Sequence, residues 1–467
     1  MSGTNGKLEL PYPEFIARKS HLANGGGFKT TFMPEKAKDF QRYLIDWNLW
    51  NARSGCFADC GLGKGLIGLA WSENIVRHTN KRVLFVTPLA VSYQILIEAE
   101  KFGIEAKRSH KGELDSKTLI SVTNYEQLHC FNPSDFVGIV GDEGSRIKNF
   151  NGKTRKAMTE FMKKIPYRLI ATATAAPNDF IEFGTISEAL GYTGFIDMLN
   201  KYFKNDKNNS AIGRHFGKKT EWRFKGHAKT AFWRFIASFA RAGRKPSDFG
   251  DFSDNDFVLP PLIENEHFVE AKMLADGFLF DLPAVGLNDQ REEQRRTIKE
   301  RCEKAAEIVN SKPNEPSLCW VNLNPEGDYL TSIIKGAVQI SGRDSDEQKE
   351  EKFIAFINGE ITKLVSKLKV CGFGLNLQHC AHTTYFPWHS FEQKYQGIRR
   401  FWRFGQKRPV VVDTVLTEGQ RMILANVRRK EIQADEMFTS LIMEMKNATR
   451  EDKINEFIKR EELPQWL

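Results

Sequence analysis

The sequence lacks any long apolar run. No apolar segment in the 467 residues reaches the roughly 18 to 20 residues that are needed to span a bilayer. The polar start at residues 1–4 does not resemble a signal peptide. We therefore expect a chain without a membrane segment that works in the cytoplasm.

Cysteine is also sparse. The seven cysteines are odd in number, scattered, and form no Cys-x-x-Cys pair, which favours a reducing compartment and argues against structural zinc. One cluster has metal-like side chains: His379, Cys380, His382 and His389. The apolar residues around it, such as Leu377 and Tyr385, indicate a buried strand and a turn instead. No internal repeat of short period and no low-complexity tract is present.

Acidic residues are scarce in one segment. Between residues 197 and 246 there are thirteen basic residues against three acidic ones, in a chain whose net charge is +9. Such a segment is typical of a surface that follows nucleic-acid phosphates. We take four of its residues as candidate contacts: Lys218, Lys219, Arg223 and Lys225. Its aromatics from Phe232 to Phe239 recur at helical spacing, which predicts core packing more than stacking on bases.

The sequence does contain a glycine-rich turn at residues 58–65, Ala-Asp-Cys-Gly-Leu-Gly-Lys-Gly. Gly61 and Gly63 allow a tight loop whose N–H groups point inward, and Lys64 can reach phosphates from the start of the following helix. A serine or threonine hydroxyl usually follows the lysine, but this chain has Gly65. The turn predicts a site for a nucleoside triphosphate.

Apolar, β-branched runs follow the turn at helix-length intervals, which predicts a parallel sheet with crossover helices. They lie at residues 83–86, 118–122, 137–140 and 169–170. Directly after the third run come Asp142 and Glu143, a pair suited to a magnesium-binding carboxylate and a water-activating neighbour.

A second series of such runs predicts a second sheet, at residues 318–321, 337–340, 361–365, 383–386 and 410–415. Before its last member, residues 396–406 carry three arginines without a local acidic partner. Planar guanidinium groups bind phosphate oxygens in pairs, so this stretch is a candidate for phosphate recognition.

These patterns divide the chain into four parts. We predict lobe one at residues 1–196, a basic, partly helical insert and linker at 197–262, lobe two at 263–417 and a helical tail at 418–467. Residues 289–310 mix both charges at helical spacing, which predicts a solvated helix. The tail has one apolar side, which we expect to pack against lobe two: Met437, Phe438, Leu441, Ile442 and Met445.

The order of these motifs resembles the superfamily-two helicases, and within them the Swi/Snf-like branch, particularly the short DNA-dependent ATPases of bacteriophages. The resemblance covers roughly residues 30 to 418 and rests on eight segments in the family's order: 40–41, 58–65, 86–88, 122–126, 142–143, 171–174, 372–378 and 396–406. It implies two RecA-like lobes that use ATP and Mg²⁺, and a monomer that binds DNA in the host cytoplasm if its source is viral.

The resemblance also implies roles for single residues. Gln41 would recognise the adenine, Lys64 the phosphates, Asp142 the magnesium ion and Glu143 the attacking water. Arg400 and Arg403 would be arginine fingers, and Gly374 and Gln396 would lie beside the nucleotide. Thr123, Asn124 and Lys148 are candidates for contacting nucleic acid.

Three functions compete on this evidence. The first is an ATP-driven translocase on double-stranded DNA, and the second is a strand-separating helicase on single-stranded DNA or RNA. The third is a module that binds nucleotide and DNA but hydrolyses ATP poorly because Gly65 lacks the hydroxyl. A P-loop kinase is disfavoured because a second sheet with its own arginine motif would then have no purpose.

Overall fold

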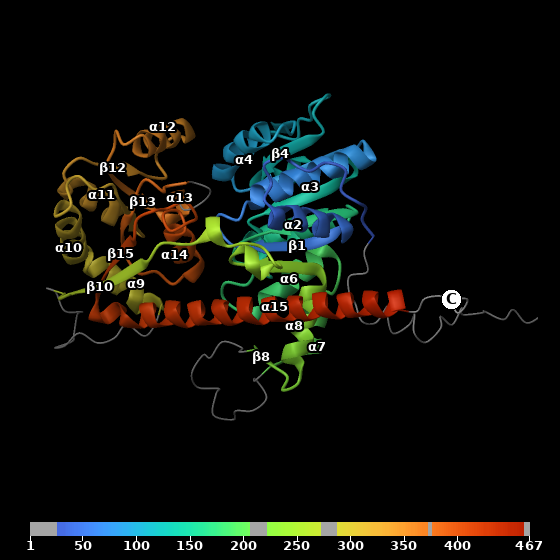
Figure 1. Cartoon of the computed structure of the whole chain (residues 1–467). Coiled ribbons are helices and arrows are strands. Elements are labelled where there is room, and N and C mark those ends of the chain that lie inside the picture. The colour runs from blue at the N-terminus through green and yellow to red at the C-terminus, as the bar shows by residue number, and fades with distance from the viewer. Residues whose placement is uncertain (1–25, 206–221, 272–286, 372–375, 462–467) are drawn as a thin grey trace, which may run out of the picture.

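The structure is a computed structural model that describes residues 26–205, 222–271, 287–371 and 376–461. Two parallel-sheet lobes lie side by side, and one long helix runs along both of them (Figure 1). This confirms the predicted fold class. Lys218, Lys219 and Gly374 lie outside the described residues.

Lobe one is built on a parallel sheet. Within the described residues its strands lie in the order β3-β4-β2-β5-β6-β1-β9, with every neighbouring pair parallel. They are β1 (Arg53–Ala58), β2 (Arg82–Thr87), β3 (Ala106–Arg108), β4 (Ile120–Asn124), β5 (Phe136–Asp142), β6 (Tyr167–Ala171) and β9 (Ala240–Gly243). Because the carboxyl ends of parallel strands meet at one edge, the loops after β1, β2 and β5 lie along the same edge of the sheet.

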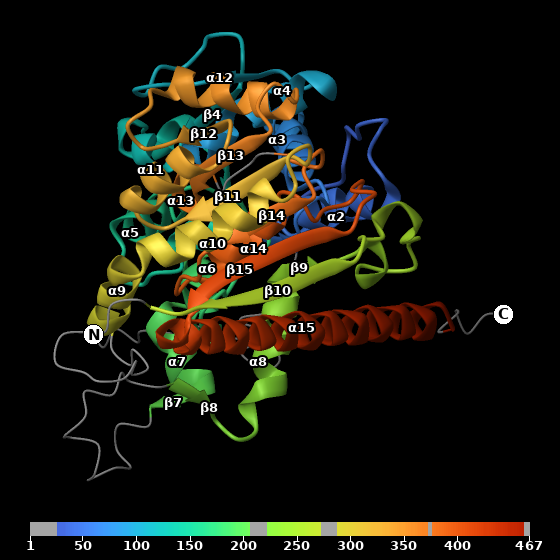
Figure 2. The same ribbon diagram turned by 90° about the vertical axis from the view of Figure 1, so that its left-hand side faces the viewer.

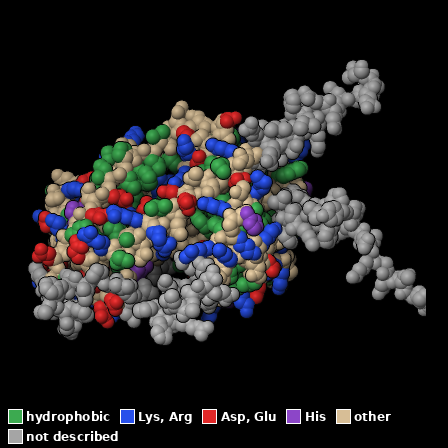
Figure 3. Space-filling model, turned by 90° about the horizontal axis from the view of Figure 1, so that it is seen from below, with side chains coloured by type: hydrophobic (Ala, Val, Ile, Leu, Met, Phe, Trp, Pro, Cys, Tyr) green, Lys and Arg blue, Asp and Glu red, His purple; other side chains and the backbone are tan. Residues whose placement is uncertain are grey.

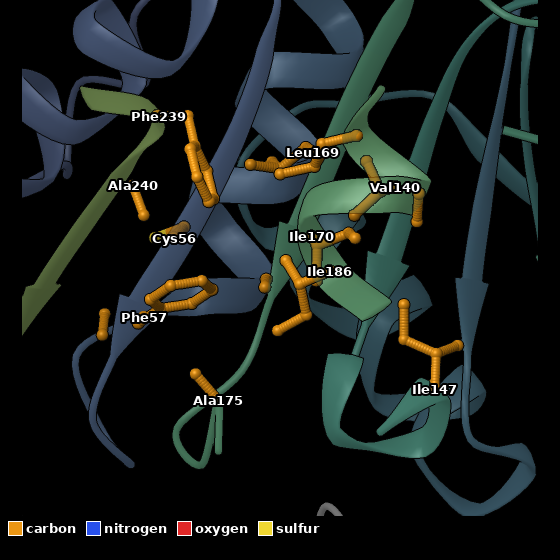
Figure 4. Packing of buried hydrophobic residues seen from close by; sticks show 14 of the residues in the cluster. Cys56, Phe57, Val140, Ile147, Leu169, Ile170, Ala175, Ile186, Phe239 and Ala240 are labelled. Carbon is orange, nitrogen blue, oxygen red and sulfur yellow. The ribbon is translucent and has the colours of Figure 1, made fainter. Parts of the chain in front are cut away.

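Helices connect these strands and bury them on both sides, as a parallel sheet requires. They are α2 (Asp39–Trp50), α3 (Lys64–Thr79), α4 (Leu89–Lys101), α5 (Lys153–Met162), α6 (Phe183–Leu190), α7 (Phe195–Tyr202) and α8 (Ala228–Phe239). Figure 4 shows part of the resulting core, where Ile170 of β6 and Ile186 of α6 lie close together. Burying each such side chain stabilises the fold by about 1.5 to 3 kcal/mol.

Lobe two repeats the plan with a second parallel sheet, of order β10-β15-β14-β11-β13-β12 in the described part of the chain. Its strands are β10 (Leu262–Val269), β11 (Ser317–Val321), β12 (Ala337–Ile340), β13 (Lys363–Lys367), β14 (His382–Tyr385) and β15 (Val410–Thr417). Its helices are α9 (Leu287–Arg296), α10 (Ile298–Asn310), α11 (Asn324–Ile333), α12 (Asp346–Ile357), α13 (Leu368–Cys371) and α14 (Phe391–Ile398). Figure 2 shows this lobe in front of lobe one.

The segment predicted as an insert contributes to the lobe-one sheet. Its strand β9 pairs in parallel with β1, from Gly55 with Ala240 to Ala58 with Gly243. The preceding helix α8 buries Phe232, Trp233, Phe235 and Phe239 in the lobe-one core, so the prediction that these aromatics are core residues is confirmed. The boundaries of the four predicted parts stay a prediction.

The tail is one continuous helix, α15 (Arg421–Glu461), of 41 residues and therefore about 60 Å long. The expectation that its apolar side packs against lobe two is wrong. Met437, Phe438, Leu441 and Met445 belong to the lobe-one core, beside α8 and β9. The reason is length, because Met437 lies about 24 Å along the helix from its start and so is past lobe two.

The beginning of α15 contacts lobe two. There Val427 and Ala434 pack with Phe391, and Arg428 forms an ion pair with Glu266 of β10. Further along, Arg244 binds Asp435 of α15, and Arg234 of α8 lies 3.6 Å from Glu444. α15 therefore bridges the two lobes, as Figures 1 and 2 both show.

Residues 289–310, which were predicted as a solvated helix, fall in α9 and α10 and are partly buried. Arg301 of α10 is fully buried and its Nη1 lies 2.8 Å from Oε1 of Glu326 on α11. Ala305 and Ala306 on the same helix are small enough to let α10 pack closely on the lobe-two core. None of the helices within the described residues is long and apolar enough to cross a membrane.

Candidate nucleotide site between the two lobes

The loop between β1 and α3 has the backbone of a phosphate cradle. Gly61 and Gly63 have φ of 89° and 84°, which residues with a side chain rarely adopt. Helix α3 begins at Lys64, so the unpaired N–H groups of its first turn face the loop and favour an anion there. The loop predicted from sequence therefore has the local conformation that phosphate binding needs.

Lys64 is folded back onto this loop. Its ammonium group donates to the carbonyl oxygens of Ala58, at 3.0 Å, and of Asp59, at 3.2 Å. These contacts hold a positive charge at the mouth of the cradle, where the charge of a phosphate would be met.

Asp142 and Glu143 stand at the carboxyl end of β5, next to this loop. The Thr87 hydroxyl donates to Oδ2 of Asp142 at 2.8 Å, and the Tyr125 hydroxyl donates to the Asp142 carbonyl at 2.6 Å. Burial raises the pKa of Asp142, while the bond from Thr87 and the charge of Lys64 oppose that rise. A strand end and two hydroxyl groups thus fix this carboxylate in place.

Glu143 is the more strained of the pair. Its φ is 54°, in the left-handed region, and it is only 9% exposed. Burial raises the pKa of its carboxyl group, the charge of Asp142 raises it further, and Lys64 and Arg400 lower it. Its Oε2 atom has no hydrogen-bond partner among the described residues. A buried, unpaired carboxylate oxygen held in a costly backbone conformation is typical of a functional group.

The arginine stretch of lobe two faces these carboxylates. Arg400 is buried, which lowers its pKa, and the charges of Cys60, Glu143 and Asp142 raise it. Burial also lowers the pKa of Arg403, and the neighbouring charges of Arg400 and Arg399 act in the same direction. The structure therefore brings Arg400 and Arg403 of lobe two to the lobe-one loop.

Sequence reasoning missed the arginine with the closest contact to the loop. Arg399 is 1% exposed, and its Nη2 lies 2.9 Å from Oδ2 of Asp59 and donates to the Cys60 carbonyl at 2.8 Å. The Tyr395 hydroxyl donates to Oδ1 of Asp59 at 2.6 Å. A signal was present in the sequence, since Asp59 is the single acidic residue of the loop and Arg399 belongs to the arginine stretch.

Gln41 holds the loop from the other side. Its Nε2 donates to the Leu62 carbonyl at 3.0 Å, and its Oε1 accepts from the Lys38 N–H at 2.9 Å. Gln396 of α14 is buried, and its Nε2 has no partner among the described residues. Both amides lie on the elements that flank the loop, and their contact with a nucleotide stays a prediction.

The place beside Gly65 is filled by another residue. A Cβ atom at Gly65 would lie 2.1 Å from Oε2 of Glu98, and 3.2 Å from Cδ1 of Ile95. Glu98 belongs to α4, 33 positions along the chain, and sequence reasoning did not single it out.

The candidate nucleic-acid residues are in varied surroundings. Thr123 and Asn124 are buried, and Oδ1 of Asn124 accepts from the Gln127 N–H at 3.0 Å, where it caps a short helix. Lys148 forms an ion pair with Glu392 of lobe two, and the Thr174 hydroxyl lies 3.5 Å from the same carboxylate. Contact with nucleic acid by these residues stays a prediction.

Part of the basic segment is neutralised by its surroundings. Lys245 pairs with Asp254 at 2.8 Å, and the buried Arg241 lies 3.9 Å above the Trp47 ring. Other members of the segment are exposed: Lys201, Lys204, Arg223 and Lys229. Lys225 donates to the Asn200 carbonyl. On the face that α7, α8 and α15 share, lysine and arginine side chains lie across the middle, with carboxylates among them (Figure 3).

The metal-like residues of lobe two are dispersed. Nε2 of the buried His382 lies 2.8 Å from Oδ2 of Asp413, and Cys380 belongs to the lobe-two core. No group of three histidine, cysteine or acidic residues within the described ranges is arranged to hold a metal ion by itself.

Comparison with known proteins adds little to this geometry. No protein-family model matches the chain, and no curated protein sequence matches it. Among solved structures, the Sulfolobus solfataricus SWI2/SNF2 ATPase core in complex with dsDNA is similar, with a TM-score of 0.40 and 16% identity. The match covers 88% of this chain and 98% of that chain. A likeness at this level decides neither the activity nor the partner.

Proposed function

We propose that this chain hydrolyses ATP at the boundary of its two lobes and uses the cycle to move on double-stranded DNA. One observation carries the proposal: Arg400 and Arg403 of lobe two are held near the loop and carboxylates of lobe one, where burial lowers the pKa of both guanidinium groups. Arginines that one lobe brings to a phosphate-binding loop of the other are well placed to bind an anionic ligand that the two lobes share.

Each residue has a task in that reaction. The N–H groups of the loop and Lys64 hold the phosphate chain, and Asp59 keeps the loop closed through Arg399. The free Oε2 of Glu143 orients the attacking water and accepts its proton. Arg400 and Arg403 stabilise the charge that develops on the transferred phosphoryl group.

The donor set also fits a magnesium ion. The Asp142 carboxylate is fixed by Thr87 beside the loop, and magnesium prefers oxygen ligands of this kind with water and phosphate in the remaining places. When bound, the ion offsets negative charge on the β- and γ-phosphate oxygens. Thr87 and Tyr125 keep the β5 end in place for this task.

The DNA part of the proposal rests on charge and on the resemblance in motif order. The exposed lysines and arginines of residues 197–246 offer contacts to phosphate, and positive charge there is not matched by acidic residues in sequence. A motor would couple closure of the lobes to a step along the backbone, because Lys148 and Glu392 join the lobes beside the nucleotide site. The relation to the bacteriophage branch stays a prediction.

Steady-state ATP hydrolysis tests the proposal, measured without nucleic acid, with duplex DNA, with single-stranded DNA and with RNA. We expect the strongest stimulation by duplex DNA, displacement of a triplex-forming strand, and a loss of about 100-fold or more in the variant Glu143→Gln. Stimulation by single strands alone would favour the helicase. Nucleotide binding without turnover would favour the hydrolysis-impaired module.

A further inference from the structure

Glycine at position 65 and glutamate at position 98 depend on each other. Any side chain at residue 65 would begin 2.1 Å from Oε2 of Glu98, which is far inside a van der Waals contact. The Glu98 carboxylate therefore stands where a threonine side chain would stand in an ordinary phosphate-binding loop. Glu98 thus places a carboxylate oxygen close to where the hydroxyl oxygen of a threonine at residue 65 would lie.

The charges around Glu98 are those of the nucleotide site. Burial is the main cause that raises the pKa of its carboxyl group, and the charges of Arg403, Lys101 and Lys64 oppose that rise. The charge of Glu98 in turn raises the pKa of Asp142. Glu98 thus belongs to the same electrostatic cluster as Lys64 and Asp142, although it lies on a different helix.

Glu98 has a spare oxygen. Nε2 of Gln94 lies 3.4 Å from its Oε1, a long hydrogen bond, while Oε2 has no hydrogen-bond partner within the described residues and lies against Gly65. Glu98 is half-buried, and a carboxylate that is partly withdrawn from water is normally paired or bound to a metal. A second observation points to a ligand at this site: Oε2 of Glu143, on a residue 9% exposed, is also without a partner in the described part of the chain.

We propose that Oε2 of Glu98 is a magnesium ligand and replaces the hydroxyl that Gly65 lacks. The proposal rests on the proposed ATP site and adds a second protein carboxylate to Asp142. It removes the reason to expect impaired hydrolysis from Gly65. It also makes a specific claim about substitution: a side chain at residue 65 and the Glu98 carboxylate compete for the same place.

Magnesium dependence of nucleotide binding tests this claim without turnover. The probe is a fluorescent, non-hydrolysable ATP analogue, titrated first in EDTA and then with increasing magnesium chloride. For Glu98→Gln we expect an affinity in EDTA that is no lower than that of the wild type, because a negative charge near the phosphates is removed. We also expect a magnesium concentration at half-saturation that is higher by about 10-fold or more, equivalent to about 1.4 kcal/mol. The matched control is Glu100→Gln, an exposed carboxylate on the same helix, which should leave both values unchanged.

A second pair of variants separates ligation from packing. Gly65→Thr alone should push the flexible end of Glu98 out of its place, whereas Gly65→Thr with Glu98→Ala should fold and regain most of the magnesium dependence. Magnesium dependence that is equal in the wild type and Glu98→Gln would overturn the proposal and leave Glu98 as a carboxylate that only balances the charge of Arg403. Absence of analogue binding by the wild-type protein would instead overturn the proposed function itself.

Discussion

At the scale of single residues, the site depends on ion pairs that cross from one lobe to the other. Arg399 and Asp59 are both almost fully buried, with 2.9 Å between Nη2 and Oδ2. Removing one member of a buried pair costs about 3 to 5 kcal/mol, because the other charge stays buried without its partner. The pair therefore stabilises the contact between lobe two and the loop of lobe one only while both partners are present.

This pair predicts a clear coupling in a double-mutant cycle. Arg399→Ala and Asp59→Ala should each lower the thermal midpoint, and the double variant should lose less than the sum of the two effects. The coupling should be about 1 to 3 kcal/mol. Thermal unfolding of the four proteins, followed by circular dichroism, measures it. Additive losses would show that the two side chains act independently.

A half-buried glutamate near the lobe boundary predicts a dependence on pH. Burial raises the pKa of Glu182 from its ordinary value to about 7, although Asn178 donates to both of its carboxylate oxygens. Because the folded-state pKa is above the unfolded value, this group stabilises the fold fully below about pH 4.5. That contribution is lost as the pH rises through about 7.

The test compares the wild type with Glu182→Gln by urea unfolding at pH 5 and pH 8. The stability of the wild type relative to the variant should fall by about 1 to 2 kcal/mol between the two values, a discounted figure because the side chain is partly exposed. A difference that does not change with pH would mean that Glu182 is ionised throughout.

Residue-scale features were predictable where the contact is local in sequence. The positive φ of Gly61 and Gly63 follows from the loop motif, and Asp142 follows from its place at the end of an apolar run. The contacts of Glu98 with Gly65 and of Arg399 with Asp59 were not predictable. They join distant parts of the chain, and only the packing of α4 and of the two lobes brings them together.

At the scale of elements, periodic patterns in the sequence predicted helices and strands, but not the part of the molecule on which each of them packs. The apolar side of the tail was evident in the sequence, yet the lobe that it covers depends on where a 41-residue helix ends up in space. Strand β9 carried no signal, because Ala-Arg-Ala-Gly contains no β-branched residue and becomes a strand only by pairing with β1.

The packing of α15 predicts a loss of stability in lobe one. Leu441 is fully buried beside α8, so Leu441→Ala should cost about 2 to 5 kcal/mol. The control is Met443→Ala, whose side chain is 56% exposed on the same helix and should change stability by less than about 0.5 kcal/mol. Denaturant unfolding of both variants measures the difference. Equal effects would place α15 away from the lobe-one core.

At the scale of the whole molecule, charge is distributed unevenly, and under the proposed function this distribution sets how the protein binds DNA. The net charge of +9 arises mainly between residues 197 and 246. Each phosphate that the protein neutralises releases condensed counterions, so affinity should fall steeply as salt rises. The slope of that fall measures how many phosphates are neutralised.

Charge reversal in this segment therefore predicts a smaller slope. Replacing Lys218, Lys219, Arg223 and Lys225 by glutamate should weaken duplex binding and reduce the logarithmic salt slope by about one for each phosphate that the protein no longer neutralises. The matched control changes four exposed lysines outside the segment by the same charge: Lys81, Lys111, Lys117 and Lys335. Fluorescence anisotropy across a salt titration measures both. The same slope in all three proteins would assign this charge to solubility.

Lobe two is attached to lobe one at both of its ends. Residues 244–261 lead into it from β9, and α15 leads back from it to the lobe-one core. In polymer terms lobe two is a loop whose two ends are both held on lobe one. Bringing its residues to lobe one therefore costs little further conformational entropy. Its arginines therefore meet the loop after β1 at a high effective concentration that does not depend on how dilute the protein is.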